Sequence, residues 1–247
     1  MQASTSQKLK KVVRLATRPR VFVAMTRDVV RNAYGRIRFH WSKNETGKET
    51  VDYKVYQTYD TYLAHQRGKL KKLDLSDHDE RYRAHLVKIF QGLDADIVTK
   101  GKTVLCLAAR IGTEVKAFLD RGCFAIGIDL NPGENNHYVV SGDFHHLQFP
   151  DQSVDIVFTN SLDHAFNIPK ILGEVKRVLK PTGHFILEII HGTEEGYDFG
   201  FYEAARWKKI DDVVEIFAEN GFQVHRRHNI REPWSAGGEH ISFILQR

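Results

Sequence analysis

The amino-acid sequence predicts an α/β protein built on a doubly wound, mostly parallel sheet. From Lys102 onward, short apolar runs that suit buried strands alternate with amphipathic helical patterns. Strands that alternate with helices imply parallel pairing with right-handed crossovers. The first repeat of this pattern runs from Lys102 to Asp129 as strand, tight turn, helix, strand and acid.

This first unit has the form of half a nucleotide-binding fold. An apolar strand precedes Ala108, and a turn containing Gly112 leads into an amphipathic helix. A second strand is predicted from Phe124 to Ile128, and Asp129 follows it directly. An acid about 20 residues beyond the turn is placed to accept hydrogen bonds from a ribose hydroxyl pair. Asp129 lies 21 positions after Ala108, as that arrangement requires.

Further elements follow on both sides of this unit. We expect strands over 138–140, 154–159, 184–190, 222–228 and 240–246, and helices over 168–179 and 207–219, with a break at 180–183. Upstream, helices are predicted over 53–73 and 79–90. Their polar and aromatic side chains are candidates for substrate contacts, although ordinary packing is the simpler explanation for each: Tyr53, Tyr56, Tyr59, Tyr62, His65, Gln66, Arg67, His78 and His85.

The basic character of the chain is concentrated at its N-terminus. Residues 1–43 hold eleven Lys and Arg against Asp28 alone, while the whole chain holds 36 basic and 31 acidic residues. The remaining residues are therefore acidic overall. Amphipathic helices packed on the main domain are the simplest interpretation of this arm. Contact with an anionic membrane surface or with RNA is the functional alternative, and a targeting peptide is a third.

Composition and spacing set the class of protein. At 247 residues and 42% hydrophobic content, the chain suits one α/β domain with an extension. Cys106 and Cys123 read as buried thiols, and no apolar run approaches the ~20 residues that span a bilayer. We expect a basic helical arm over 1–43, a helical cap or linker over 44–100 and the main domain over 101–247. The expected location is cytoplasmic, with a peripheral membrane position as the alternative.

Four stretches together resemble the class I S-adenosylmethionine-dependent methyltransferases, in their type 11 small-molecule branch. They read VLCLAARIGTE, AIGIDLNP, VSGDFHHLQFPDQSVDIVFTNSLDH and EVKRVLKPTGHFILEI. The last two are the most specific, because they join an acid–aromatic pair, a Pro-Asp-x-Ser turn, a strand and a helix ending in VLKPTG. The similarity covers residues 101–247. It implies a Rossmann-like sheet of seven strands with the last antiparallel, helices on both faces and a helical N-terminal extension.

The resemblance also implies S-adenosylmethionine as cofactor and assigns its contacts. Asp129 matches the acid that binds the ribose, and Leu130 is expected on the adenine face. Asp143 matches the acid that accepts a hydrogen bond from the adenine amino group, with Phe144 beside it. Asn160 stands next to the methyl donor, at the carboxyl end of its strand.

The first turn departs from the family pattern. Its three glycine positions hold Ala108, Arg110 and Gly112, and Cys106 replaces the acid. One hypothesis is that Arg110 binds the carboxylate of the methionyl end, since guanidinium matches carboxylate geometry. Glu114 could replace the missing acid at the ammonium end. A side chain of Arg110 that lies away from the site is the alternative.

The catalytic assignment is made among acids and histidines near the strand ends. Methyl transfer is an in-line displacement, and an oxygen or nitrogen acceptor that carries a proton needs a base. We prefer His164 with Asp163 beside it; His191 is a further candidate, and His145 and His146 are more distant. No metal is predicted, because adjacent histidines seldom chelate one ion. The acidic and aromatic segment 191–207 could cover a small organic substrate, or it is a surface loop.

The predicted function is methyl transfer from S-adenosylmethionine to an oxygen or nitrogen of a small molecule. A non-catalytic binding module is one alternative, suggested by the altered turn. An RNA methyltransferase recruited by the basic arm is another. Methylation of DNA bases is disfavoured, because Asn160 is not followed by the usual Pro-Pro-aromatic run. A nicotinamide-dependent dehydrogenase is disfavoured because the first turn lacks Gly-x-Gly-x-x-Gly.

Overall fold

A computed structural model describes residues 40–42, 51–68, 78–231 and 237–246. The chain divides into two compact units, residues 1–40 and 41–247. The helices predicted for the N-terminal arm lie outside the described residues, so the fold below is that of the second unit. The boundaries predicted at residues 43 and 100 remain predictions.

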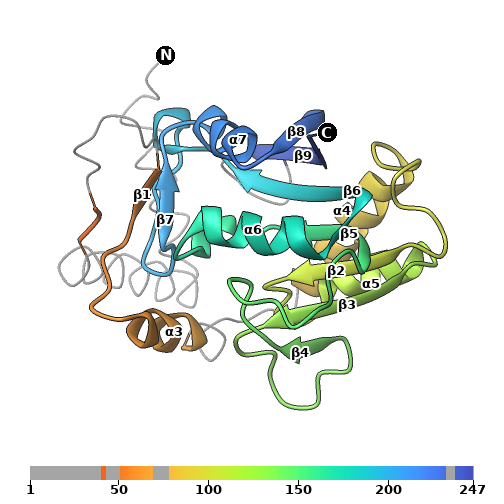
Figure 1. Cartoon of the computed structure of the whole chain (residues 1–247), viewed down its shortest axis with the longest axis horizontal. Helices are drawn as coiled ribbons and strands as arrows, with labels where there is room; N and C mark the ends of the chain where they lie inside the picture. Colours follow the sequence, from red (N-terminus) through yellow and green to blue (C-terminus); the bar gives the residue numbers. More distant parts are fainter. Residues whose placement is uncertain (1–39, 43–50, 69–77, 232–236, 247) are drawn as a thin grey trace, which may run out of the picture. The chain divides into compact units, whose positions relative to one another are not determined.

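A seven-stranded sheet forms the centre of this unit (Figure 1). Its strands are β2 (Thr103–Leu107), β3 (Phe124–Asp129), β4 (Val139–Ser141), β5 (Val154–Thr159), β6 (Leu179–Ile190), β8 (Phe222–Ile230) and β9 (Gly238–Leu245), in the order β4-β3-β2-β5-β6-β9-β8. Neighbouring strands in the series β4, β3, β2, β5 and β6 pair in parallel, whereas β9 runs antiparallel to both β6 and β8. The predicted mostly parallel sheet with an antiparallel last strand is confirmed.

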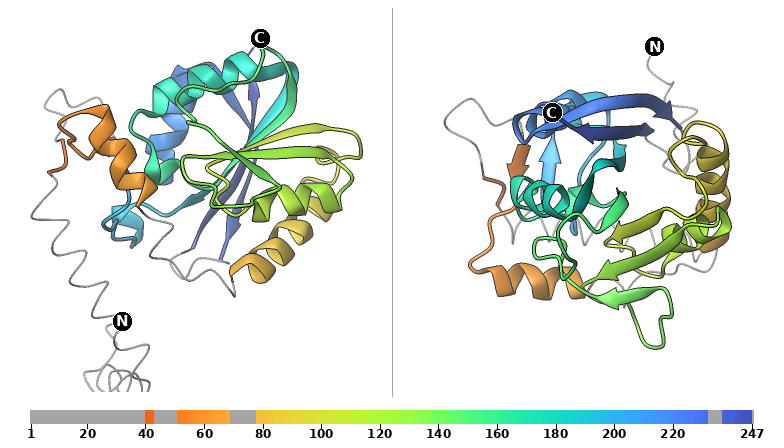
Figure 2. Two further views of the ribbon diagram at one scale, coloured as in Figure 1. Left: turned by 90° about the horizontal axis from the view of Figure 1, so that it is seen from below. Right: turned by 45° about the vertical axis from the view of Figure 1, so that its right-hand side comes forward.

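Helices cover both faces of the sheet (Figure 2). Helices α4 (His78–Gln91) and α5 (Thr113–Asp120) share one apolar cluster, and α6 (Ile168–Val178) and α7 (Ile210–Glu219) share the other. On β2, Val104 and Cys106 belong to the first cluster, while Leu105 and Leu107 belong to the second. Successive side chains point to opposite faces of a strand, so the apolar run of β2 is buried on both sides.

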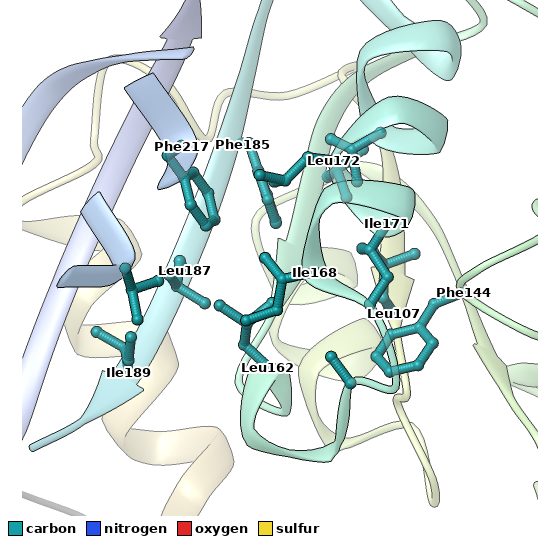
Figure 3. Packing of buried hydrophobic residues seen from close by; sticks show 14 of the residues in the cluster. Leu107, Phe144, Leu162, Ile168, Ile171, Leu172, Phe185, Leu187, Ile189 and Phe217 are labelled. Atoms are coloured by element: carbon teal, nitrogen blue, oxygen red, sulfur yellow. The ribbon is translucent and has the colours of Figure 1, made fainter. Parts of the chain in front are cut away.

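The core between the sheet and α6 fixes the position of that helix (Figure 3). Ile168, Ile171 and Leu172 recur at helical spacing and are fully buried together with Phe185 and Leu187 of β6. The helix starts where the Asn167 side chain accepts a hydrogen bond from the Lys170 N–H at 2.9 Å. Helix α6 is thereby held directly after the carboxyl end of β5.

A second, two-stranded sheet corrects two helix predictions. Strand β1 (Val51–Tyr53) pairs antiparallel with β7 (Ala205–Trp207). The helix predicted over 53–73 therefore begins later, as α3 (Tyr59–Arg67), where the Thr58 hydroxyl accepts from the Thr61 N–H. The helix predicted over 207–219 begins at Ile210 for the same reason. In both cases the helical pattern extended the predicted helix into residues that instead form a strand with a partner far away in the sequence.

The helix ends before residues 180–183 as predicted, but these residues lie within the following strand, which begins earlier than the predicted His184. Helix α6 ends at Val178 and β6 begins at once with Leu179, which pairs with Val154 of β5. A register shift in the ladder after Val154 accommodates Pro181 and its neighbours within the strand. No helix within the described ranges is long and apolar enough to cross a membrane.

Candidate active site

Two adjoining cavities lie at the carboxyl ends of β2, β3 and β5. The first, of about 60 Å³, is lined by Tyr62, Gln66, Ala108, Arg110, Asp129, Leu130, Asn131, Gly142, Phe144, Ser161 and His164. The second, of about 200 Å³, is lined by Ala108, Ala109, Arg110, Ile111, Thr113, Glu114, Asn160, Ser161, Asp163, His164, Ile190, Tyr197 and Glu203. The two share Ala108, Arg110, Ser161 and His164, so they form parts of one cleft.

The turn between β2 and α5 forms the floor of this cleft. Ala108 and Arg110 have φ angles of 53° and 46°, and Gly112 has 80°. All three positions that the family fills with glycine are therefore left-handed, although two carry side chains. The turn lies close against β3, because a Cβ on Gly127 would meet the Ala109 Cβ at 2.7 Å.

Asp129 joins the end of β3 to the turn. Its Oδ2 accepts a hydrogen bond from the Arg110 N–H at 3.0 Å, and its Oδ1 accepts from the Asn131 N–H at 2.8 Å. Each carboxylate oxygen keeps a further lone pair for a ligand. Asp129 and Leu130 both line the first cavity, as predicted for neighbours of a bound nucleoside.

Helix α3 supplies the opposite wall of the first cavity. Tyr62 and Gln66, one helical turn apart, both line it. The Tyr62 hydroxyl donates to the His164 carbonyl at 3.0 Å, and the Gln66 amide donates to the Tyr202 carbonyl at 2.8 Å. The sequence marked both side chains as substrate-contact candidates, although packing was the simpler explanation.

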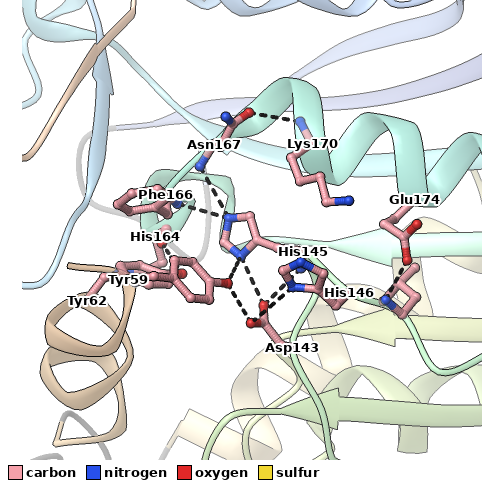
Figure 4. Close-up of polar contacts among 11 residues, drawn as sticks. Tyr59, Tyr62, Asp143, His145, His146, His164, Phe166, Asn167, Lys170 and Glu174 are labelled. Carbon is pink, nitrogen blue, oxygen red and sulfur yellow. Dashed lines mark hydrogen bonds and ion pairs between the residues drawn. The ribbon is translucent and has the colours of Figure 1, made fainter. Parts of the chain in front are cut away.

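Asp143 is held in a polar cluster beside the cavities (Figure 4). Its Oδ2 accepts from the Tyr59 hydroxyl at 2.5 Å, and its Oδ1 lies 2.9 Å from His145 Nδ1. Because His145 Nε2 accepts from the backbone N–H groups of Phe166 and Asn167, its Nδ1 carries the proton. Burial raises the Asp143 pKa, but the bonds from His145 and Tyr59 outweigh it and lower that pKa to about 2.

Asp143 itself lines neither of the two cavities. Its neighbours Gly142 and Phe144 line the first cavity instead. Gly112 lies outside both linings too, at the N-cap of α5, where a Cβ would meet the Tyr138 Cβ at 2.7 Å. The other predicted cofactor residues are brought together at the cleft.

Glu114 is a buried carboxyl group that faces the second cavity. The residue is 7% exposed, and its Oε1 accepts from the Asn160 side-chain amide at 3.1 Å. Its Oε2 has no hydrogen-bond partner among the described residues. Burial raises the Glu114 pKa to about 7, against the lowering effects of its backbone hydrogen bond, Arg110 and Asn160. A donor group on a ligand would satisfy this oxygen.

His164 and Asp163 come together at the second cavity. His164 Nδ1 lies 3.0 Å from the Tyr202 carbonyl, so it donates and leaves Nε2 as the acceptor of the neutral ring. Nε2 lies 3.5 Å from Asp163 Oδ2, and both residues line the cavity. The other three histidines considered for a base, namely His145, His146 and His191, line neither cavity.

Tyr197 and Glu203 were missed as individual site residues. Both come from the acidic, aromatic segment 191–207, which the sequence singled out only as a substrate cover. Their side chains face the second cavity because β7 pairs with β1 and holds the end of this segment. Over the part of the chain that the structure describes, no group of three or more His, Cys, Asp or Glu is arranged to hold a metal ion.

Comparison with known proteins shows which family part of the chain resembles. Residues 105–187 match the family described as "Methyltransferase domain", of type 11. Over these residues the predicted resemblance to the class I S-adenosylmethionine-dependent methyltransferases is confirmed. The seven-stranded sheet with helices on both faces is the predicted Rossmann-like fold, and the match supports S-adenosylmethionine as the cofactor.

Relatives of the chain differ in their named substrates. The chain is 29% identical over 135 residues to a phthiotriol/phenolphthiotriol dimycocerosates methyltransferase of Mycobacterium leprae, covering 49% of each protein. It is 34% identical over 94 residues to a ubiquinone/menaquinone biosynthesis C-methyltransferase of Rickettsia rickettsii, covering 38% of each. The match thus spans about half or less of these curated relatives.

A solved structure shares the fold over more of the chain. The Burkholderia thailandensis 1,6-didemethyltoxoflavin-N1-methyltransferase, solved with its substrate and S-adenosylhomocysteine, has a TM-score of 0.59. It is 14% identical and the match covers 85% of this chain and 99% of that one. At this identity the likeness concerns the fold alone.

Proposed function

We propose that the protein transfers a methyl group from S-adenosylmethionine to an oxygen or nitrogen atom of a small-molecule acceptor. The observation that carries this proposal is the pairing of the two cavities. Asp129, Leu130 and Phe144 line one, Glu114 and Asn160 line the other, and the turn at Ala108 and Arg110 borders both. One elongated ligand with a nucleoside end and an amino-acid end suits this division.

The residues at the cleft suit the proposed cofactor. A carboxylate with spare lone pairs at the end of β3 can accept from both ribose hydroxyls, which is the role of Asp129. The partnerless Oε2 of Glu114 suits the ammonium of the methionyl end. Arg110, which lines both cavities, suits its carboxylate. Bound there, the cofactor would supply a methyl group on a sulfonium, with a neutral thioether as the leaving group.

The acceptor would bind in the part of the second cavity lined by Asp163, His164 and Tyr197. His164 Nε2 can take the proton that an oxygen or nitrogen acceptor loses, because Nδ1 is committed to the Tyr202 carbonyl. Asp163 Oδ2, 3.5 Å from Nε2, would then stabilise the imidazolium. A small acceptor is favoured by the cavity volume of about 200 Å³, part of which the methionyl end occupies.

Contacts of residues 1–43 with RNA or with an anionic membrane remain predictions, because nearly all of that segment lies outside the described residues. A non-catalytic binding role also remains a prediction. The altered turn motivated that alternative, yet its three residues adopt the left-handed backbone that the glycine pattern serves.

Titration with S-adenosylhomocysteine tests the cofactor assignment. At 100 times its Kd, the ligand should add about 2.7 kcal/mol to the free energy of unfolding. Asp129→Asn should raise the Kd about 10-fold or more, because the amide presents only one acceptor oxygen. Glu215→Gln, at an exposed position of α7, is the matched control and should leave the Kd unchanged. Wild-type protein that shows no stabilisation by millimolar S-adenosylhomocysteine would contradict the proposal.

A further inference from the structure

The second cavity contains two buried carboxylate oxygens that lack a hydrogen-bond partner among the described residues. One is Oε2 of Glu114, and the other is Oε2 of Glu203. A buried carboxylate oxygen without a donor loses its hydration and gains nothing in return. Glu114 is 7% exposed and faces the cavity, so the cavity is built to receive a ligand that carries donor groups.

A single cofactor does not satisfy both oxygens. In the function proposed above, the one ammonium of the methionyl end meets Glu114, which lies beside Asn160 at the turn after β2. Glu203 belongs to a different wall. The N–H of the next residue, Ala204, donates to the Asp163 carbonyl at 2.7 Å, which fixes Glu203 beside η2 (Leu162–His164). Of the two ligands of the proposed reaction, the acceptor is therefore the one that can offer a donor to Glu203.

The charge of this wall indicates which kind of donor it takes. Burial raises the pKa of the Tyr197 hydroxyl, and the carboxylates of Glu203, Asp163 and Asp198 raise it further. Across the whole cavity, Arg110 is the one Lys or Arg of the lining, against three carboxyl groups. This excess of carboxyl groups in the lining favours a bound cation over a neutral hydroxyl.

Lys54 lies behind this wall, and its Nζ is hydrogen-bonded to backbone carbonyl groups. Its Nζ donates to the carbonyls of Gly200 and Phe201, at 3.0 and 2.6 Å. Burial lowers the Lys54 pKa to about 8, although Glu203 raises it. Lys54 does not line the second cavity, and Glu203 Oε2 has no hydrogen-bond partner among the described residues.

We propose that Glu203 is the specificity residue of the acceptor subsite, and that the acceptor is a small amine that binds as a cation. This inference rests on the proposed methyltransferase function and makes the reaction an N-methylation. It separates this chain from relatives whose names describe C-methylation.

The proposed reaction takes place at the nitrogen atom of the amine. The ammonium group gives one proton to His164 Nε2, which frees the nitrogen lone pair while Glu203 keeps hold of a remaining N–H. The nitrogen then forms its bond to the methyl carbon as the carbon–sulfur bond breaks, and that electron pair stays on sulfur. Positive charge ends on the nitrogen, where the carboxylate of Glu203 stabilises it.

Binding to the full chain saturated with S-adenosylhomocysteine tests this inference without turnover. Calorimetric titrations would use phenylethylamine, tyramine and histamine, each paired with its N-acetyl derivative, which keeps the shape and loses the cation. We expect at least one amine to bind 10-fold or more tightly than its acetylated partner. Glu203→Gln should abolish that preference and leave the Kd of S-adenosylhomocysteine within about twofold. Glu215→Gln, exposed on α7, should change neither.

Three results would overturn the inference: no amine binds better than its acetylated partner, no compound binds although S-adenosylhomocysteine does, or Glu203→Gln keeps the preference. Failure of S-adenosylhomocysteine itself to bind would instead contradict the proposed function. Denaturant unfolding of Glu203→Gln shows whether the variant is folded, and Glu203→Asp provides a second variant that retains the charge and should keep a reduced preference.

Discussion

The side-chain amide of Asn160 donates a hydrogen bond to the Tyr82 hydroxyl oxygen at 2.7 Å. Tyr82 in turn donates to Oε2 of the buried Glu188 at 2.6 Å. Burial raises the Glu188 pKa, but hydrogen bonds from His240 and His85 outweigh it and lower that pKa to about 2. Glu188 is therefore a carboxylate that anchors Tyr82, and Tyr82 orients the amide of Asn160 at the cleft.

Tyr82→Phe should accordingly weaken both stability and cofactor binding. The variant leaves Glu188 Oε2 without its donor and Asn160 without one acceptor, in a fully buried place. We expect a loss of about 1–3 kcal/mol in the free energy of unfolding. Denaturant unfolding measures it, and titration with S-adenosylhomocysteine should show a Kd raised a few-fold. Tyr138→Phe, at a residue 38% exposed, should change stability by less than about 0.5 kcal/mol.

The left-handed turn predicts that a smaller residue stabilises the protein. Ala108 has φ of 53°, which costs about 1–2 kcal/mol for a residue with a Cβ. Ala108→Gly removes that strain at an entropic cost of about 0.5–1 kcal/mol. The net effect should be a gain of up to about 1 kcal/mol in the free energy of unfolding. A loss of stability in this variant would show that packing of the Ala108 methyl group stabilises the protein by more than the backbone strain costs.

Ala125→Gly is the matched control for that substitution. Ala125 lies in β3, outside the group of residues with positive φ. Glycine there gains no relief of strain and loosens a strand, so the variant should lose about 0.5–1 kcal/mol or more. Opposite signs for the two Ala-to-Gly changes are the expected pattern.

The fold could be predicted where local pattern decides it. Strand β5 occupies Val154–Thr159 as predicted, because its apolar run is bounded by turn residues before and Asn160 after. Strands β1 and β7 could not be predicted, since each has three residues and its partner lies far along the chain: Val51 pairs with Trp207. Three residues carry too little periodicity to reveal a strand.

At the cleft, too, local pattern could be predicted from the sequence and contacts between distant residues could not. The placement of Asp129 followed from its distance to the turn, and the structure brings it to the first cavity. The engagement of Asp143 could not be foreseen, because its donor Tyr59 lies 84 residues upstream on α3. Glu203 could not be singled out for a related reason. Its position depends on the pairing of β7 with β1, and the acidic, aromatic segment around it was predicted only as a substrate cover or a surface loop.

Glu114 should make stability depend on pH. Its pKa in the folded protein, about 7, lies above the ordinary value of 4.5, so the folded state holds the proton more tightly than the unfolded chain. The contribution of Glu114 to stability is therefore greatest below pH 4.5 and falls as pH rises to 7 and above. Glu114→Gln does not titrate and keeps an acceptor for Asn160.

The difference in the free energy of unfolding between wild type and Glu114→Gln isolates the titration of Glu114. Relative to wild type, Glu114→Gln should be more stable by about 1 kcal/mol or less at pH 5 and by roughly 3 kcal/mol at pH 8.5. Guanidinium unfolding at pH 5, 7 and 8.5 measures the change, with Glu215→Gln as the exposed control that should show no such trend. A pH-independent difference would mean that Glu114 stays ionised throughout.

The contact between β3 and the turn after β2 predicts a steric limit at the cleft. A Cβ on Gly127 would meet the Ala109 Cβ at 2.7 Å and Val139 Cγ2 at 3.0 Å. Gly127→Ala should therefore push the turn away from β3, costing about 1–3 kcal/mol in the free energy of unfolding and weakening binding of S-adenosylhomocysteine. Gly173→Ala is the control: a Cβ there meets no atom within 4 Å, and alanine in α6 should add up to about 1 kcal/mol. If Gly127→Ala kept both stability and affinity, the turn would not depend on its close packing against β3.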